Sequence, residues 1–317
     1  MTKQKMKILI LLPVLILAIF LLIITIRQNI LPPAVKITPS QSYTRIISLA
    51  PNVTEILFAL GLGEHVIGVS EFCNYPAEAK DRPRFGGLMN PNFEAILAAK
   101  PDLVIALDEM VRGENKFAAM GINILAVKHD SIDDILNSIM AIGMVCGKNE
   151  QAMKLVSELK NKMSAIKMQS DARHRPKVLL SVGHDISQDP DKSPENVYIA
   201  GKDGFYSDII EKAGGQNAYT GSIPFPAVSY ESIVSMNPEV IIDVMTASPE
   251  KNVFDAEIIK KQWKKIEMID AAKNDRIYVL TEDFVAIPGP RFILTLEKIA
   301  SAINPELKLQ ANEPNSN

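Results

Sequence analysis

NFEAILAAKPDLVIAL, residues 92–107, has a close counterpart in SYESIVSMNPEVIIDV, residues 229–244. Aligned without a gap at an offset of 137 residues (231 − 94), the two stretches pair Glu94 with Glu231, and most other pairs are apolar. Each stretch reads as a short helix followed by a buried strand. This period is too long for a solenoid, so it predicts two similar α/β lobes. The alternative is a chance match, since such a helix, turn and strand are common in α/β proteins.

The segments around the repeat alternate in the same way. RIISLA (residues 45–50), HVIGVS (65–70) and GINILAV (121–127) are strand-like, and helical patterns separate them, with Thr54 and Asn92 as expected N-caps. This alternation predicts mainly parallel sheets that are covered by helices on both faces. Ligands of such sheets bind beyond the carboxyl ends of the strands, so two facing lobes predict a cleft between them.

One long helix is expected between the two lobes. Residues 148–173 contain no Gly or Pro and carry an apolar stripe at helical spacing. Such a helix is about 30 Å long or more and would act as a rigid spacer. After Pro176 the strand and helix patterns start again, and a last helix is expected from about Pro290 to Ile303.

The N-terminus has the pattern of a membrane anchor. Residues 8–26 form an apolar run interrupted only by Pro13 and Thr25, and a helix of this length spans about 28 Å, close to the hydrocarbon core of a bilayer. Lysines before the run outnumber the single arginine after it, which puts the N-terminus in the cytoplasm and the rest of the chain outside. No A-x-A site and no cysteine for a lipid follow the run, so an uncleaved anchor is favoured over a cleaved signal peptide.

These patterns divide the chain into a membrane anchor, a Pro-rich linker, an N-terminal lobe, a bridging helix, a C-terminal lobe and a flexible tail. The expected boundaries, in that order, are residues 1–30, 31–43, 44–147, 148–173, 174–304 and 305–317.

Composition and motifs exclude several functions. A net charge of −3 over 317 residues argues against a nucleic-acid binder. The chain has no G-x-S-x-G, Walker or H-E-x-x-H motif, so we do not expect an enzyme. In an oxidising compartment, a disulfide between the two cysteines, Cys73 and Cys146, is one alternative. For Cys146, which lies in an apolar stretch, a buried thiol is favoured.

Several longer stretches resemble one known family. RIISLAPNVTEILFALGLGEHVIGVSEFCNYP (residues 45–76), KAGGQNAY (212–219) and DFVAIPGPR (283–291) look like the periplasmic substrate-binding proteins of type II ABC importers, which have a helical backbone between their lobes. Members of this superfamily carry cobalamin, haem or ferric siderophores, and the cobalamin-binding proteins are the nearest in pattern. The resemblance covers roughly residues 45–303 and implies two α/β lobes, no enzymatic activity, no cofactor and a monomer.

The resemblance also implies a partner. In that family a glutamate on each lobe docks into arginines of the two permease subunits, and Glu94 and Glu231 occupy the matching positions. Carboxylate–guanidinium pairs are strong and directional, which suits docking onto a dimer. The alternative is that each glutamate only complements the dipole of its own helix.

For the cargo, the resemblance implies a cup of aromatic side chains around a flat corrinoid. The matching residues are Phe72, Tyr75, Tyr198, Phe225 and Phe284. Phe and Tyr provide large flat faces, although relatives often carry Trp at the positions of Phe225 and Phe284. For each of these aromatics the alternative is burial in the core. Trp263 lies in an amphipathic stretch and is expected in the core.

Other cargoes and roles stay open. His184 is a candidate axial ligand for the metal of a haem or corrinoid, and His129 and His184 both follow strand-like runs, as the ligands of a metal-ion site would. Arg291 would suit an anionic siderophore or a purely structural contact. A membrane-tethered protein that docks without cargo is the alternative from a different class.

Overall fold

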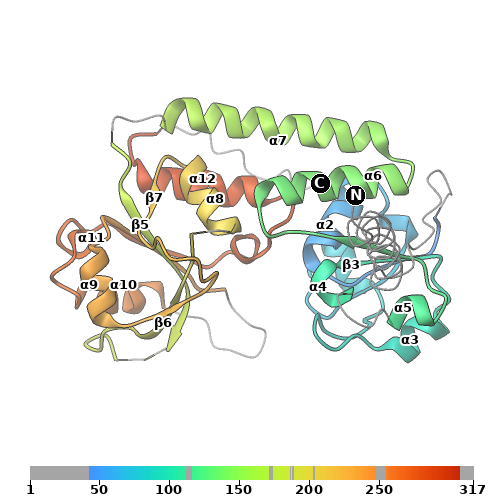
Figure 1. Ribbon diagram of the computed structural model, residues 1–317, viewed down its shortest axis with the longest axis horizontal. Coiled ribbons are helices and arrows are strands. Elements are labelled where there is room, and N and C mark those ends of the chain that lie inside the picture. Colours follow the sequence, from blue (N-terminus) through green and yellow to red (C-terminus); the bar gives the residue numbers. More distant parts are fainter. Residues whose placement is uncertain are drawn as a thin grey trace, which may run out of the picture.

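The computed structural model describes residues 43–111, 116–170, 174–185, 187, 189–202, 204–246 and 255–307. The expected membrane anchor, nearly all of the linker and most of the expected tail lie outside these residues. Within the described ranges, no helix is both long and apolar enough to cross a bilayer. Two lobes lie side by side beneath one long helix (Figure 1).

The N-terminal lobe is built on a four-stranded parallel sheet in the order β2–β1–β3–β4. The strands are β1 Ile46–Ser48, β2 Val66–Val69, β3 Leu103–Leu107 and β4 Ile124–Val127. The helices are α2 Pro51–Ala59, η1 Gly63–His65, η2 Ala77–Asp81, α3 Phe93–Ala98, α4 Asp108–Val111, α5 Lys116–Ala119 and α6 Ile132–Val145. Helices α2 and α6 pack on one face of the sheet, and α3 and α5 on the other.

The C-terminal lobe has a six-stranded mixed sheet in the order β10–β9–β5–β6–β8, with β7 paired to β5. The strands are β5 Lys177–Asp185, β6 Glu195–Ile199, β7 Gln216–Asn217, β8 Ala227–Val228, β9 Val240–Val244 and β10 Ile277–Leu280. The helices are α8 Phe205–Lys212, α9 Tyr230–Met236, α10 Ala256–Lys264, α11 Asp270–Lys273, η3 Asp283–Ala286 and α12 Phe292–Ile303. Strand β6 pairs antiparallel with β5 and β8, and the other pairs are parallel. The α/β prediction is confirmed.

The internal repeat corresponds to a repeated structural unit. At the offset of 137 residues, all five residues of β3 fall on the five residues of β9. The N-caps correspond as well: the side chain of Asn92 accepts a hydrogen bond from the Ala95 backbone at 3.0 Å, and Ser229 accepts one from Ser232 at 3.3 Å. The match is therefore architectural rather than accidental.

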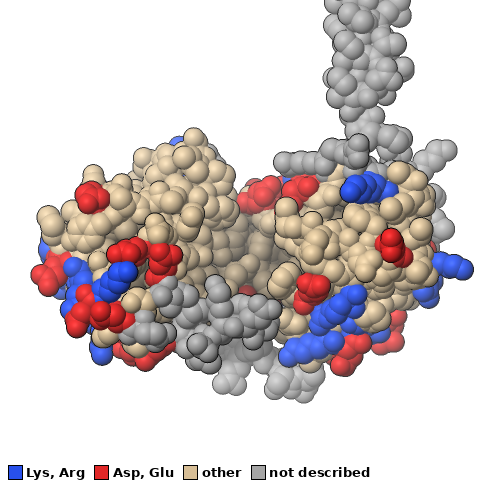
Figure 2. All heavy atoms as spheres, turned by 90° about the horizontal axis from the view of Figure 1, so that it is seen from below, with Lys and Arg blue, Asp and Glu red and all other residues tan. Residues whose placement is uncertain are grey.

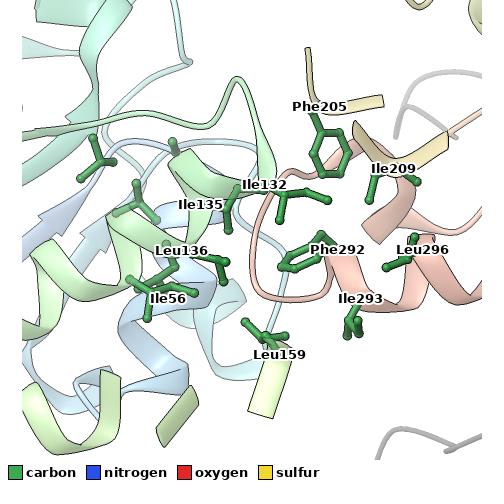
Figure 3. Packing of buried hydrophobic residues seen from close by; sticks show 14 of the residues in the cluster. Ile56, Ile132, Ile135, Leu136, Leu159, Phe205, Ile209, Phe292, Ile293 and Leu296 are labelled. Carbon is green, nitrogen blue, oxygen red and sulfur yellow. The ribbon is translucent and has the colours of Figure 1, made fainter. Parts of the chain in front are cut away.

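The lobes share one hydrophobic core in addition to the bridging helix. Helix α7, Asn149–Ser170, lies inside the range expected for the spacer and runs over both lobes (Figure 1). Beneath it, side chains from α2, α6 and α7 pack against side chains from α8 and α12 (Figure 3). A hydrogen bond of 3.1 Å from the Ile132 backbone to Asp208 Oδ2 also joins the lobes.

The N-cap expected at Thr54 is wrong. Helix α2 begins at Pro51, with Ala50 at the N-cap, and Thr54 lies inside the first turn and a half. Proline has its φ fixed near the helical value and lacks the N–H that a first turn leaves unpaired, so it starts the helix earlier. The Thr54 hydroxyl instead lies 2.8 Å from Ser48 Oγ and donates to the Ala50 carbonyl at 3.2 Å.

The cysteines and the tryptophan are all buried. Cys73 and Cys146 are free thiols, and burial raises the pKa of Cys73 and raises that of Cys146 to about 12, so both remain protonated at neutral pH. The expectation of a buried thiol at Cys146 is confirmed. Trp263 is fully buried in the core of the C-terminal lobe, as expected.

Candidate functional site

The carboxyl ends of the parallel strands of both lobes open onto one cleft. Pro51 follows β1, Leu107 ends β3 and His129 follows β4, while Thr246 and Thr281 follow β9 and β10 in the other lobe, and all five line the cleft. Ligands of open α/β sheets bind at this edge, because helix N-termini and variable loops surround it. A hollow between the lobes is visible from below (Figure 2).

The cleft has two parts, which we name after the lobe that contributes most of the distinctive wall. The N-lobe cavity has a volume of about 520 Å³ and is lined by Phe72, Leu88 and Leu107, among others. The C-lobe cavity has a volume of about 500 Å³, and its lining includes Tyr206 and Phe225. The two cavities share His129, Ala286 and Pro288, so these residues mark the middle of the cleft.

Two of the aromatics expected from the sequence line the cleft, one from each lobe. Phe72, in the loop after β2, lines the N-lobe cavity, and Phe225, in the loop before β8, lines the C-lobe cavity. Both side chains are 56% exposed, which is unusual for Phe. The Phe225 loop approaches Gly201 closely, since a Cβ at that glycine would lie 2.0 Å from the Ile223 carbonyl oxygen. Gly201 is therefore needed for this wall of the cleft.

Two other expected aromatics line a different cavity. Tyr75 and Phe284 line a third cavity of about 680 Å³ beneath α7, to which α2, α7 and α12 also contribute residues. The guanidinium carbon of Arg291 lies 3.8 Å from the centroid of the Tyr75 ring and 5.8 Å from that of Phe284. Tyr198 lies on β6 with its side chain exposed and lines none of the three cavities. The cargo roles of these three residues stay predictions.

Arg291 is held by two carboxylates from different lobes. Its guanidinium donates to Glu55 Oε1 at 2.7 Å and to both carboxylate oxygens of Asp283 at 3.0 Å. Glu55 is only 2% exposed, and its second oxygen is buried without a hydrogen-bond partner among the described residues. Burial raises the pKa of Glu55, and the Arg291 guanidinium opposes this shift. The structure therefore gives Arg291 an interlobe structural contact.

His184 is buried away from the cavities. Its Nε2 lies 2.8 Å from Asp243 Oδ2, and the same oxygen accepts a hydrogen bond of 2.6 Å from the Trp263 indole. Neither the His184 nor the Asp243 side chain is exposed. Burial alone would lower the pKa of His184, but the Asp243 carboxylate outweighs it and raises that pKa. An axial-ligand role would require this packed group to open, and it stays a prediction.

Three residues of the cleft were not assigned to a cargo site from the sequence. His129 had been considered only for a metal-ion site, and Phe205 and Tyr206 follow a glycine-rich stretch that reads as a turn. The Tyr206 hydroxyl donates to the Val285 carbonyl at 3.0 Å, and burial raises its pKa. The sequence signal that could have placed His129 in the cleft is its position, two residues beyond the end of a parallel strand. Within the described residues, no three His, Cys, Asp or Glu side chains gather into a metal site.

The two candidate docking glutamates occupy equivalent places. Glu94 and Glu231 lie in the first turns of α3 and α9, two residues after the capping Asn92 and Ser229, and both are exposed. For Glu231, its own backbone N–H and the Ser229 hydroxyl lower the pKa of the carboxyl. Each lobe therefore presents one carboxylate at the start of a corresponding helix.

Comparison with known proteins identifies relatives along most of the chain. The family model described as "Periplasmic binding protein" matches residues 46–284. An uncharacterized ABC transporter substrate-binding lipoprotein of Bacillus subtilis, YvrC, is 31% identical over 277 residues, which is 85% of this chain and 83% of that protein.

Solved structures of periplasmic binding proteins also resemble this chain. A possible iron-binding (periplasmic solute-binding) protein of Staphylococcus epidermidis is 32% identical, with a TM-score of 0.67, and the match covers 83% of this chain and 100% of that one. The periplasmic vitamin B12-binding protein BtuF of Vibrio cholerae is 26% identical, with a TM-score of 0.69, and the match covers 84% of this chain and 99% of that one.

Proposed function

Because the chain belongs to the periplasmic binding protein family, we propose that it is the extracytoplasmic solute receptor of an ABC importer and captures cobalamin or a related corrinoid between its lobes. Proteins of this family bind solutes and are not enzymes, as the sequence predicted. The bound chelate is cargo rather than a cofactor. No bond of the cargo needs to be made or broken for this role.

The observation that carries the proposal is the pair of exposed aromatic walls at the carboxyl edge of the two sheets. Phe72 and Phe225 stand on opposite lobes and line adjoining cavities of about 520 and 500 Å³. A flat, partly apolar macrocycle buries most of its surface in a cleft of this size, and aromatic side chains offer it large flat faces. BtuF of Vibrio cholerae binds vitamin B12, and this supports the choice of a corrinoid.

Calorimetric titration of the purified protein tests the cargo. The panel is cyanocobalamin, cobinamide, haemin, a ferric hydroxamate and zinc. We expect saturable binding of the two corrinoids. Phe72→Ala and Phe225→Ala should each weaken it about tenfold, because each removes an aromatic face worth about 1.4 kcal/mol.

Met168→Ala is the matched control, since Met168 is exposed on α7 and lines none of the three cavities. It should leave the dissociation constants unchanged. Binding of haemin or the hydroxamate alone would overturn the corrinoid assignment and keep the importer role. Binding of zinc alone would favour a metal-ion receptor, and binding of none of the five would favour a tethered protein that docks without cargo.

We further propose that Glu94 and Glu231 dock the protein onto a permease dimer. Their equivalent places on the two lobes support this, because a two-fold partner would meet one carboxylate from each lobe. Charge-assisted pairs with arginine would then fix the orientation of the complex. Residues 8–26, outside the described residues, would tether the protein, as a monomer, to the outer side of the cytoplasmic membrane.

Uptake of labelled cobinamide by cells that depend on this protein tests docking. Glu94→Gln and Glu231→Gln should each reduce uptake, and the double variant should abolish it, while calorimetric affinity for cobinamide stays unchanged. Glu150→Gln, an exposed glutamate in the first turn of α7, is the control with the same change of charge. Normal uptake by the double variant would refute the docking role and leave the helix-dipole explanation.

A further inference from the structure

The third cavity, beneath α7, is distinct from the two cavities of the cleft. Its volume of about 680 Å³ lies within the usual range of sites for small organic ligands. Both lobes and the bridging helix line it: Phe58 comes from α2, Leu159 from α7 and Leu294 from α12. Of its lining residues, only Asp283 also lines a cleft cavity. Capture of cargo in the cleft therefore leaves the third cavity without a role.

Much of the wall of the third cavity is aromatic or aliphatic. Phe58, Tyr75 and Phe284 contribute rings, and Leu159 and Ile293 contribute buried aliphatic side chains. The Tyr75 side chain is 41% exposed, although a guanidinium already lies against its ring. Part of this aromatic surface is therefore accessible, and it suits the apolar body of a ligand.

The charged residues around the third cavity are mostly acidic. Arg291 is already bound to Glu55 and Asp283. Two further carboxylates, those of Glu78 from η2 and Glu158 from α7, are exposed. The lining carboxylates are those of Glu55, Glu78, Glu158 and Asp283, and the lining cations are Lys162 and Arg291. This excess of negative charge favours a cationic ligand over an anionic one.

Arg291 shows how this cavity holds a cation. Its guanidinium carbon lies 3.8 Å from the centroid of the Tyr75 ring, and its nitrogens donate to Glu55 at 2.7 Å and to Asp283 at 3.0 Å. Cation–π contact and charge-assisted hydrogen bonds thus act together on one planar cation. Phe58 and Phe284 provide further rings, and Glu78 and Glu158 further carboxylates, in the same cavity.

We propose that the third cavity is a binding site for a small organic cation with an apolar body, such as an aryl amidinium. The exposed carboxylates of Glu78 and Glu158 balance its charge, and the aromatic wall covers its body. Because both lobes and α7 line the cavity, such a ligand stabilises their present arrangement. This site goes beyond the proposed receptor role, since it is neither the cargo cleft nor the docking surface.

Three ligands of nearly the same shape separate the effect of charge from that of apolar burial. At neutral pH benzamidine is a cation, benzamide is neutral and benzoate is an anion. In calorimetric titration of the full-length protein in detergent, benzamidine should bind at least about tenfold more tightly than benzamide, and benzoate should not bind. Saturating benzamidine should also raise the Tm by a few degrees, because it binds the folded protein alone.

Variants assign the binding to the third cavity. Glu78→Gln and Glu158→Gln should each weaken benzamidine binding by about threefold, as expected for exposed charges, and Glu150→Gln, elsewhere on α7, should not. Ala59→Trp places a large side chain in the cavity from the end of α2 and should abolish binding. Ala98→Trp is its control, because Ala98 is the exposed last residue of α3 and lines none of the three cavities.

Several results would overturn the cation site. Equal affinity for all three ligands would mean that charge is not recognised, and no binding of benzamidine up to about 10 mM would mean that there is no site. Unchanged binding in Ala59→Trp, or displacement of benzamidine by a chelate that binds the protein, would place the ligand elsewhere. The benzamidine titration itself needs no cargo. Failure of every chelate to bind would therefore overturn the proposed function and leave the cation site standing.

Discussion

Arg291 ties the two lobes together through a carboxylate that water does not reach. Replacing it by Met keeps an unbranched apolar side chain at this position but removes the guanidinium over Tyr75 and leaves Glu55, 2% exposed, without its cation. Removal of one member of a buried ion pair typically costs about 3 to 5 kcal/mol, because the remaining charge stays desolvated. We expect Arg291→Met to lower the free energy of unfolding by that amount in urea denaturation, and Glu55→Gln in the same chain to recover most of it.

Lys298→Met provides the comparison for an accessible ion pair. Lys298 Nζ lies 2.6 Å from Glu282 Oε1, with both side chains more than a third exposed. Exposed pairs contribute about 1 kcal/mol or less. An equally small loss in Arg291→Met would show that water reaches Glu55 and that the interlobe contact adds little.

His184 should make the stability of the protein depend on pH. Its pKa is raised in the folded state, so its contribution is fully present below the unfolded pKa of about 6.5 and is lost as the pH rises through the folded pKa. The difference in unfolding free energy between the wild type and His184→Gln should therefore be larger at pH 6 than at pH 9. Asp243→Asn removes the cause of the shift and should flatten this dependence. A difference that grows with pH would contradict the assignment.

At the level of elements, the helix N-caps connect the sequence repeat with stability. Asn92→Ala and Ser229→Ala each remove a side-chain acceptor for a backbone N–H of α3 or α9, which typically costs about 1 kcal/mol. Because the caps are in different lobes, the losses in urea denaturation should add to about 2 kcal/mol. Ser164→Ala, in the exposed middle of α7, should change stability by less than about 0.5 kcal/mol. If Asn92→Ala and Ser229→Ala also changed stability by less than about 0.5 kcal/mol, water would replace the capping oxygens.

The sequence predicts elements well where the signal is local. Residues 148–173 contain α7, and the capped helix and buried strand of each repeat lie where the pattern puts them. The error at Thr54 arose because a capping hydroxyl and a first-turn proline compete to start a helix, and Pro51 won. Sequence patterns register both signals but give no measure of their relative strength.

The cleft was harder to predict than the fold. Phe72 and Tyr75 are three residues apart in one loop, yet they line different cavities, because the path of the loop turns between them. Hydrophobic periodicity carries no information on loop paths, so the sequence groups these aromatics together. His129 was accessible to a positional argument, since it follows a parallel strand, but its central place depends on how the two lobes meet.

On the scale of the whole molecule, the shared core restricts movement between the lobes. Side chains of α6, α8 and α12 pack together under α7, and Phe292 lies fully buried among them (Figure 3). Closing or opening the cleft widely would break these contacts. We therefore expect cargo to change the distance between the lobes by about 1 Å or less, as in other pre-organised complexes. Spin labels on Glu94→Cys and Glu231→Cys report that distance, and the native Cys73 and Cys146 are buried.

Phe292→Ala tests whether the core, rather than α7 alone, limits the movement. Truncating a fully buried Phe typically costs about 3 to 5 kcal/mol and leaves a void at the junction of the lobes. In this variant the distribution of distances between the labels should become broader and should shift when cyanocobalamin binds, although α7 is unchanged. If the distance between the labels changes by several ångströms on binding in the protein with the native Phe292, the lobes close like a hinge and the packing at their junction must rearrange. A narrow, unresponsive distance in Phe292→Ala would instead assign the restriction to α7 and to the Arg291–Glu55 contact.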